Sequence, residues 1–402
     1  MKKTVILSLI TATVLTTVCS AEEKSILDIL HTAIADMKKV VNEKTVTSVE
    51  VTKVTVKGEE KTTSQVSEQK INSIGEGKAI GEIISEAGKT TSSTDKKNVS
   101  EKKVEPSIAS TSEAFDYKLS PKKVAENVWC FLGALDKPTK ENAGFMANSC
   151  YVKTSEGYFL MDSGPSYQFA KQAYDVMKKI ANLPVKYVVN SHHHDDHWLG
   201  NDFYKKTFNA KLIGPESINS NYKEGDKTRM YKVLPANAIE GTHIIKLDVV
   251  PKKEMVVTLG GEEFHIIPMD VKAHTSDDVF VYMPKSKVLF GGDLVMNGRV
   301  NSDRDGAVMG ELKAIKMMRG MEWNTLVPGH GLITDKTALD ETELYFTLMK
   351  KRVLEAMEDD VDATGITDRV KLEEFKDKAM YDLLNARNVG YAFDELEMLD
   401  DE

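Results

Sequence analysis

The segment with the clearest chemical potential is residues 192–197, which read His-His-His-Asp-Asp-His. Four imidazoles and two carboxylates within six residues have no apolar face to bury, and the imidazoles repel one another once they are protonated. A bound cation removes that conflict, because neutral imidazole and ionised carboxylate are good metal ligands. Within the segment, His192, His194, Asp196 and His197 form the spaced pattern His-x-His-x-Asp-His. The alternative is an exposed loop that binds metal only adventitiously.

Three further groups of the same chemistry follow later in the chain. They are Ala273-His274-Thr275, Gly291-Gly292-Asp293-Leu294 and Pro328-Gly329-His330. Each stands beside an apolar run and next to small residues that allow close backbone approach. Any one of them alone is more typical of an ordinary turn, but the set indicates a metal centre assembled from distant segments.

The elements that must position these groups come from the periodicity of apolar residues. Strands are predicted at 128–132, 144–152, 158–161, 185–189, 211–213, 254–259, 263–268, 278–283 and 287–290, and helices at 166–182, 310–320 and across most of 336–398. The strand at 185–189 ends directly before Ser191-His192, so the first cluster is expected on a loop above a rigid scaffold. Helices interleaved with two groups of strands predict a layered α/β or α+β domain.

The ordered motifs resemble those of the metallo-β-lactamase superfamily from about Val128 to His330, including Asp162-Ser163-Gly164 as the family's aspartate turn. The resemblance implies an α+β fold, an αββα sandwich, with two zinc ions at one edge. It assigns His192, His194 and His274 to the first ion, Asp196, His197 and His330 to the second, Asp293 to a bridge, and Asp162 to an orienting role. His193 and Asp195 are expected to point away, and His31, His243 and His265 lack motif context.

The implied chemistry is hydrolysis of a small-molecule ester, thioester, lactone or similar bond by a hydroxide shared between the metals. Asp196 would orient the nucleophile or carry its proton. Zinc suits these ligands, and iron and manganese use the same donors.

Two positions distinguish branches of the superfamily. Asp293 stands where the largest zinc β-lactamase subclass has a cysteine ligand, and Met296 stands where that subclass has a lysine that binds the β-lactam carboxylate. Arg299 could replace that lysine as a substrate-binding residue, although an exposed loop arginine is the simpler interpretation. The Asp bridge resembles the glyoxalase II type, and the tail from Asn388 resembles exported zinc hydrolases associated with quinoprotein or sulfur-oxidation systems. The competing functions are a β-lactamase and an iron-dependent persulfide dioxygenase, which keeps His-x-His-x-Asp-His.

Composition limits the location and the partners of the chain. Its net charge is −9, without a basic block, so nucleic acid is not an expected partner. Lys2, Lys3 and an apolar run that is short for a membrane span predict a signal peptide at 1–21 and a periplasmic or secreted zinc protein. Lipidation at Cys19 is the less favoured alternative, and no later segment reaches transmembrane length.

The 402 residues divide unevenly. All Phe, Tyr and Trp lie at or after Phe115, so a packed core is expected only there. We predict a helix plus a flexible Ser/Thr/Lys/Glu-rich segment at 22–112, a catalytic domain at 113–335 and a helical extension at 336–402. The helical spacing at 24–42 could support an oligomer. Cys130 and Cys150 could form a disulfide in an oxidising compartment or remain two structural thiols.

Overall fold

The computed structural model describes residues 49–56, 59–66, 113–223 and 225–400. The predicted signal peptide and the predicted helix at 24–42 lie outside these residues. The chain separates into two units, Met1–Pro106 and Ser107–Glu402. In the first unit, β1 (Val49–Val56) and β2 (Glu59–Val66) pair antiparallel. The second unit holds every predicted site residue and is described below.

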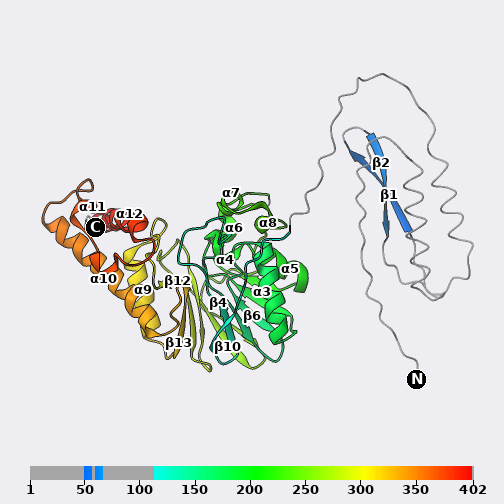
Figure 1. Cartoon of the computed structure of the whole chain (residues 1–402), viewed down its shortest axis with the longest axis horizontal. Coiled ribbons are helices and arrows are strands. Elements are labelled where there is room, and N and C mark those ends of the chain that lie inside the picture. Colours follow the sequence, from blue (N-terminus) through cyan, green and yellow to red (C-terminus); the bar gives the residue numbers. More distant parts are fainter. Residues whose placement is uncertain (1–48, 57–58, 67–112, 224, 401–402) are drawn as a thin grey trace, which may run out of the picture. The chain divides into compact units, whose positions relative to one another are not determined.

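Two β-sheets form the centre of the second unit (Figure 1). The six-stranded sheet has the order β3-β4-β5-β6-β7-β8, with strands β3 (Lys122–Ala125), β4 (Val128–Phe131), β5 (Ser149–Lys153), β6 (Tyr158–Met161), β7 (Val185–Val189) and β8 (Lys211–Ile213). The five-stranded sheet has the order β13-β12-β11-β10-β9, with β9 (Met255–Leu259), β10 (Glu262–Pro268), β11 (Val279–Met283), β12 (Val288–Met296) and β13 (Thr325–His330). Both sheets are mixed, because β6-β7-β8 and β12-β13 are parallel and the remaining pairs are antiparallel.

Helices cover the outer face of each sheet (Figure 1). One layer contains α3 (Tyr167–Ile180), α4 (Asp195–Trp198), α5 (Asn201–Phe208), α6 (Glu216–Asn221), α7 (Met230–Val233) and α8 (Ala236–Ile239). The other contains α9 (Val308–Arg319), α10 (Lys336–Glu358), α11 (Ile366–Arg369) and α12 (Tyr381–Asp400), with a 3₁₀ turn at Glu373–Phe375. The predicted αββα sandwich is therefore confirmed.

Three apolar clusters hold the four layers together. The middle cluster lies between the sheets, where the rings of Phe159 and Phe264 stack with centroids 3.9 Å apart. The strands that contribute to it are apolar on both faces, as expected for strands buried on both sides. None of the described helices is long and apolar enough to cross a membrane.

One sequence expectation about strand length is wrong. The strand predicted at 287–290 continues as β12 to Met296, so Asp293 lies inside a strand instead of following one. Pairing with β13 continues past Phe290 because the register shifts at Gly292 and again before Met296. Register shifts of this kind bend a strand locally, and Asp293 lies between Gly292 and Met296, within the second shift.

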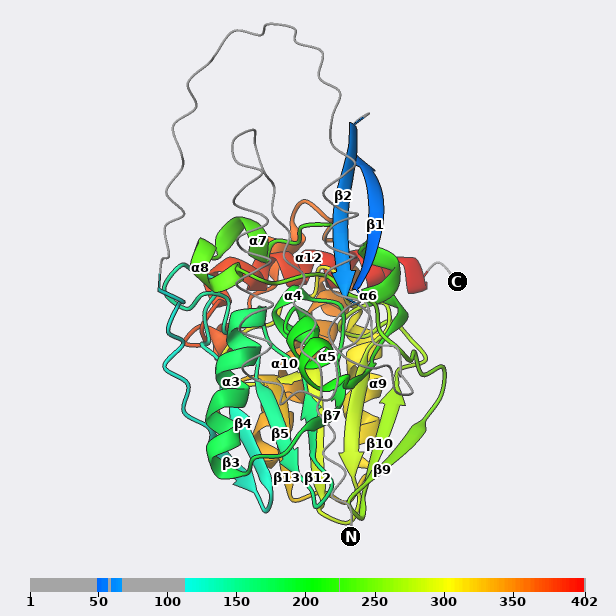
Figure 2. The ribbon, with the colours of Figure 1, turned by 90° about the vertical axis from the view of Figure 1, so that its right-hand side faces the viewer.

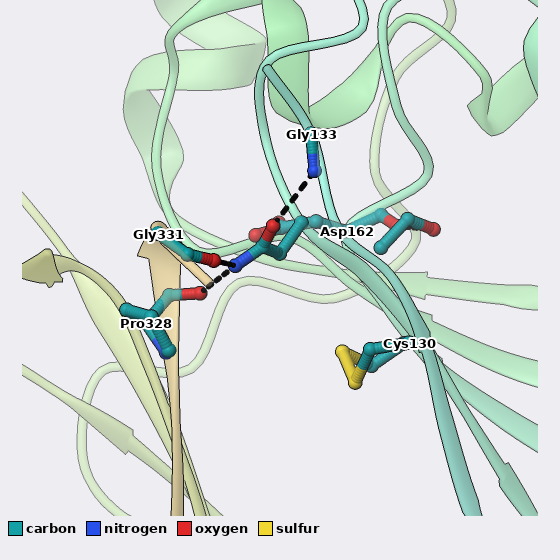
Figure 3. The surroundings of a disulfide bond; sticks show 8 residues. Cys130, Gly133, Asp162, Pro328 and Gly331 are labelled. Carbon is teal, nitrogen blue, oxygen red and sulfur yellow. Dashed lines mark hydrogen bonds between the residues drawn. A yellow bond between two sulfur atoms is a disulfide. The ribbon is translucent and has the colours of Figure 1, made fainter. Parts of the chain in front are cut away.

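Cys130 and Cys150 form a disulfide in this structure. The two residues are directly opposite each other in the β4-β5 pair, and their Cα atoms are 4.1 Å apart. The bond lies in the cluster between the sheets, near the loop that begins at Gly133 (Figure 3). The pairing that the sequence left open thus follows from strand register.

Candidate metal centre

The predicted ligands converge at one end of the two sheets. The six-stranded sheet contributes His192, His194, Asp196 and His197 from the segment after β7, and that segment turns into the short helix α4. The five-stranded sheet contributes His274 from the β10–β11 loop, Asp293 from β12 and His330 from the end of β13. All seven side chains are buried, with exposed fractions of 9% or less. Figure 2 shows the sandwich in a second view.

The first group of donors contains three imidazoles and one carboxylate. His194 Nδ1 lies 2.9 Å from His192 Nε2 and 3.1 Å from His274 Nε2. Asp293 Oδ2 lies 3.4 Å from His274 Nε2 and 3.7 Å from His192 Nε2. Donors around a tetrahedral zinc ion at about 2.0–2.1 Å are themselves roughly 3.3 Å apart. These spacings therefore fit a single zinc-sized ion.

The second group shares Asp293 with the first. Asp293 Oδ1 lies 3.3 Å from His197 Nε2, and its Oδ2 lies 3.3 Å from His330 Nε2. Asp196 Oδ2 is 3.3 Å from His330 Nε2 and 3.8 Å from His197 Nε2. Asp293 is thus the one side chain whose oxygens face both groups, which is the arrangement expected of a bridging carboxylate.

Each ring of the second group is turned by a partner on its outer nitrogen. His197 Nδ1 lies 2.9 Å from Asp162 Oδ2, and His330 Nδ1 donates to the carbonyl oxygen of Met146 at 2.9 Å. Both contacts direct Nε2 toward the centre, where His197 Nε2 is buried without a hydrogen-bond partner among the described residues. Asp162 therefore contacts His197 on the side of the ring that faces away from the centre.

Rings of the first group have outer partners too. Ser191 Oγ lies 3.0 Å from His192 Nδ1, and Asp305 Oδ2 lies 3.0 Å from His194 Nε2. The contact to Asp305 explains why His194 presents Nδ1, and not Nε2, to the centre. Sequence reasoning missed both partners. Ser191 could have been found because it precedes the motif, but Asp305 has no local signal.

Burial and the neighbouring carboxylates change the pKa values of the histidines at the centre. Burial lowers the pKa of His192 well below its usual value and that of His274 to about 3, so both rings are neutral at pH 7. Burial also opposes the charged form of His197 and His330, but the carboxylates around them together outweigh it and raise the pKa of both rings. Asp293 is the largest of these contributions, followed by Asp162 and Asp196 at His197 and joined by Asp196 at His330. Protons and metal ions consequently compete for these two imidazoles.

Arg229 holds the carboxylate of Asp196 by a hydrogen bond to the oxygen that faces away from the centre. Sequence reasoning assigned no role to Arg229. Arg229 Nη2 donates to Asp196 Oδ1 at 3.2 Å and to Asp195 Oδ1 at 2.7 Å. Asp195 also accepts from the backbone N–H of Met230 at 3.0 Å. Asp195 therefore points away from the metal ligands, as expected, and Arg229 leaves Oδ2 of Asp196 directed at the centre.

The remaining described histidines are not members of the two donor groups, although a ring nitrogen of His193 lies within 4.8 Å of a ring nitrogen of His194. His193 is half-buried and its carbonyl accepts from Trp198 Nε1. His265 bonds Glu254 on the five-stranded sheet, and His243 is exposed. His31 lies outside the described residues.

Arg299 is held beside the centre by its neighbours in sequence. The N–H of Asn297 donates to the carbonyl of His330 at 3.2 Å, and Asn301 Nδ2 donates to the carbonyl of Asp293 at 2.9 Å. In the sequence, Arg299 stands between Asn297 and Asn301, and its side chain is half-buried. It donates to the carbonyl of Val300 at 3.4 Å and to the carbonyl of Asp136 at 3.3 Å. Among the described residues no carboxylate forms an ion pair with it. Three of its five N–H donors remain available to an anion.

Close backbone contacts join the two sheets under the centre. Asn148 Nδ2 donates to the carbonyls of Pro328 and Gly331, and its Oδ1 accepts from Gly133, so one side chain links the sheets (Figure 3). A Cβ on Gly329 would lie 2.0 Å from Asp293 Oδ1. Glycine is therefore required at 329 for Asp293 to keep its position.

Comparison with known proteins shows which family and which proteins this part of the chain resembles. Residues 143–330 match the model of the metallo-beta-lactamase superfamily. The metallo-beta-lactamase IND-1 of Chryseobacterium indologenes is 29% identical over 151 residues, which cover 38% of this chain and 55% of that protein. A type 2 metallo-beta-lactamase of Elizabethkingia meningoseptica is 27% identical over 206 residues, covering 49% of this chain and 74% of the relative. The chain thus spans about half the length of the first relative.

Among solved structures, the stereoselective inverting sec-alkylsulfatase Pisa1 from Pseudomonas sp. is similar in fold. The TM-score is 0.50 at 17% identity, and the match covers 68% of this chain and 50% of the other.

Proposed function

We propose that the chain is a dinuclear zinc hydrolase of the metallo-β-lactamase superfamily, whose model matches residues 143–330. Its substrate would be a small molecule with an ester, thioester, lactone or similar bond. The observation that carries the proposal is Asp293, whose two oxygens face two separate groups of buried imidazoles. Two bound zinc ions would supply a water of lowered pKa as nucleophile and would polarise the scissile carbonyl.

The chain's own residues contribute position and proton transfer. Arg229 prevents rotation of Asp196, so Oδ2 of that carboxylate stays near His330 and can orient the attacking water or accept its proton. Asp162 and the carbonyl of Met146 keep His197 and His330 in the tautomer that presents Nε2 to the centre. Burial of Asp196, His197 and His330 keeps bulk water away from them and strengthens the interactions that they make.

Arg299 is our candidate for binding the substrate outside the reacting bond. Its free N–H donors suit a carboxylate or another oxyanion. A substrate with such a group would be held between Arg299 and the metal centre.

β-Lactam hydrolysis is the second candidate, because the two relatives compared above carry that name. Met296 is buried and cannot pair with a β-lactam carboxylate, so Arg299 would have to do so. We expect the simpler esters and thioesters to be better substrates.

We also propose export to the periplasm or the medium. The disulfide between Cys130 and Cys150 is consistent with an oxidising compartment. Secretion of the native chain, with loss of its first residues, would test this part of the proposal.

The test of function combines metal analysis with an activity screen. The chain is produced without metal supplementation, its bound metals are measured by mass spectrometry, and hydrolysis is followed with thioesters, lactones, phosphodiesters and β-lactams. The proposal expects two zinc ions per chain and zinc-dependent turnover in at least one class. His192→Ala should lose zinc and activity, whereas the matched control His265→Ala should keep both.

Two outcomes would contradict the proposal. A single iron retained after dialysis, with oxygen consumption on a persulfide substrate, would identify a sulfur dioxygenase. Two tightly bound zinc ions without hydrolysis of any class would indicate a metal-binding protein.

A further inference from the structure

A second group of buried ligand-type side chains lies on the outer side of His274, away from the centre described above. It consists of Asp303, in the loop after β12, and Glu311, in the first turn of α9. Asp303 is 4% exposed and Glu311 and His274 are each 1% exposed. One donor atom from each of these three residues lies within 4.8 Å of the others.

The polar atoms of this group have no hydrogen-bond partners among the described residues. They are both carboxylate oxygens of Asp303, both of Glu311, and Nδ1 of His274. The nearest pair, Glu311 Oε1 and His274 Nδ1, is 3.7 Å apart, which is longer than a hydrogen bond. Five unpartnered polar atoms at one buried place need a ligand, because a buried polar group without a partner is costly.

The charges around the group favour a cation as that ligand. Among the described residues neither Asp303 nor Glu311 forms an ion pair with a lysine or arginine. The neighbouring titratable groups are acidic: Glu395 faces Asp303 from α12, and Asp278 and Asp293 face Glu311. Two carboxylates without a counter-charge match one divalent ion.

We infer that Asp303 and Glu311 bind a third cation, a hard divalent ion of the calcium type, on the Nδ1 side of His274. Oxygen donors at about 2.3–2.6 Å from such an ion can lie up to roughly 4.8 Å apart, which fits the observed spread. A calcium-type ion is favoured over zinc because both charged donors are oxygens. His274 directs Nε2 to the first group of donors, so its Nδ1 carries the ring hydrogen. This N–H lies nearest to Glu311 Oε1, at 3.7 Å, and is a donor toward that carboxylate and not a ligand of the ion.

The site would connect the metal centre to the C-terminal helices. Asn388 of α12 accepts from the N–H of Asp303 at 3.2 Å and donates to the carbonyl of Asn301 at 2.6 Å and to the hydroxyl of Tyr345 at 3.0 Å. Asn301 in turn donates to the carbonyl of Asp293. An ion between Asp303 and Glu311 would therefore stabilise the loop that supports Asp293 and the helix α9 behind His274.

The experiment measures ions directly and needs no substrate. The full chain is stripped with a chelator, refilled with two equivalents of zinc, and titrated with calcium while bound ions and the melting temperature are followed. Terbium, a luminescent substitute for calcium, is then titrated with excitation of tyrosine, because Tyr345 adjoins Asp303. We expect one calcium per chain beyond the two zinc ions, a melting temperature that rises to a plateau with calcium, and terbium luminescence that calcium suppresses.

Isosteric variants provide the control. Asp303→Asn and Glu311→Gln should retain two zinc ions, which shows that they fold, and should each bind calcium about tenfold or more weakly, because calcium affinity depends on ligand charge. Glu322→Gln, which changes an exposed glutamate, should behave like the unmodified chain.

Three results would overturn the inference. They are equal calcium binding by the unmodified chain and by Asp303→Asn with Glu311→Gln, a melting temperature that calcium does not change, and a third zinc ion in place of calcium. The first two would identify Asp303 and Glu311 as a neutral acid pair, and the third would refute the assignment of a hard ion. None of them bears on zinc-dependent hydrolysis at the centre itself.

Discussion

Replacing Asp293 tests whether the two metal positions depend on one carboxylate. Asp293 is 4% exposed and its oxygens lie 3.3–3.7 Å from nitrogens of His192, His197, His274 and His330. Removing one partner of a buried charged group costs about 3–5 kcal/mol, which corresponds to a loss of affinity on the order of 10²- to 10⁴-fold. Asp293→Ala should lose the second zinc first, bind the first zinc more weakly, and reduce turnover by orders of magnitude.

Two further substitutions separate charge from shape. Asp293→Asn keeps the shape and removes the charge, so it should fall between the native chain and the alanine variant in zinc affinity. Asp293→Cys introduces a thiolate that binds zinc at about 2.3 Å, so it should restore zinc content. One sulfur atom cannot provide two oxygens to two ions, so turnover should remain low.

The assay is competition with a chelator of known zinc affinity, followed by steady-state kinetics on the best substrate from the screen. Glu322→Gln serves as the control carboxylate-to-amide change. If Asp293→Ala retained two zinc ions at native affinity and near-native turnover, Asp293 would be an ordinary strand residue and the bridged site would be refuted.

Three other predictions follow from the same geometry. Arg229→Met should lower kcat about ten- to a hundredfold and weaken zinc binding at the second site, because Asp196 loses a charge-assisted hydrogen bond. Arg229→Lys should recover part of the turnover and of the zinc affinity, and native second-site affinity in Arg229→Met would contradict this role. Zinc retention should fall as the pH is lowered, and the loss should begin above pH 6.5, because the pKa values of His197 and His330 are raised above that ordinary histidine value and protons then displace zinc. Dialysis at each pH followed by metal analysis checks the sign, and tighter binding in acid would refute it. A chain that begins at Ser112 should keep its zinc and unfold cooperatively, since among the described residues the apolar clusters are built from Phe115 onward. Calorimetry tests this, and loss of either property would show that residues 22–111 support the domain.

Most of the fold was predictable because local signals agreed with one another. The apolar runs at 158–161 and 185–189 are strands β6 and β7 within the residues expected, and the helix predicted at 166–182 is α3 at Tyr167–Ile180. The residues of the two donor groups stood out in the sequence for a different reason. Histidine and aspartate in fixed spacing beside strands have few structural uses, so residue type and position already indicate a metal.

The partners that orient those ligands were decided only by the tertiary structure. Arg229 reaches Asp196 across 33 residues of chain, and Asp305 reaches His194 across 111. Neither contact has a local sequence pattern, because an arginine or aspartate in a polar loop is usually a solvated surface residue. The αββα packing brings loops from both sheets to the same end, and that packing selects which charged side chain contacts which residue of the centre.

The disulfide and the acidic group behind His274 were also decided only by the tertiary structure. Cys130 and Cys150 are strand residues in the sequence, and only the β4-β5 register places them opposite each other. Asp303 and Glu311 each look like ordinary helix-flanking acids in the sequence. They become a candidate ion site only when α9, packed on the five-stranded sheet, brings Glu311 against His274 and removes both carboxylates from water. Residue type determines which chemistry is available, and burial, which depends on the whole fold, determines which groups must find a partner.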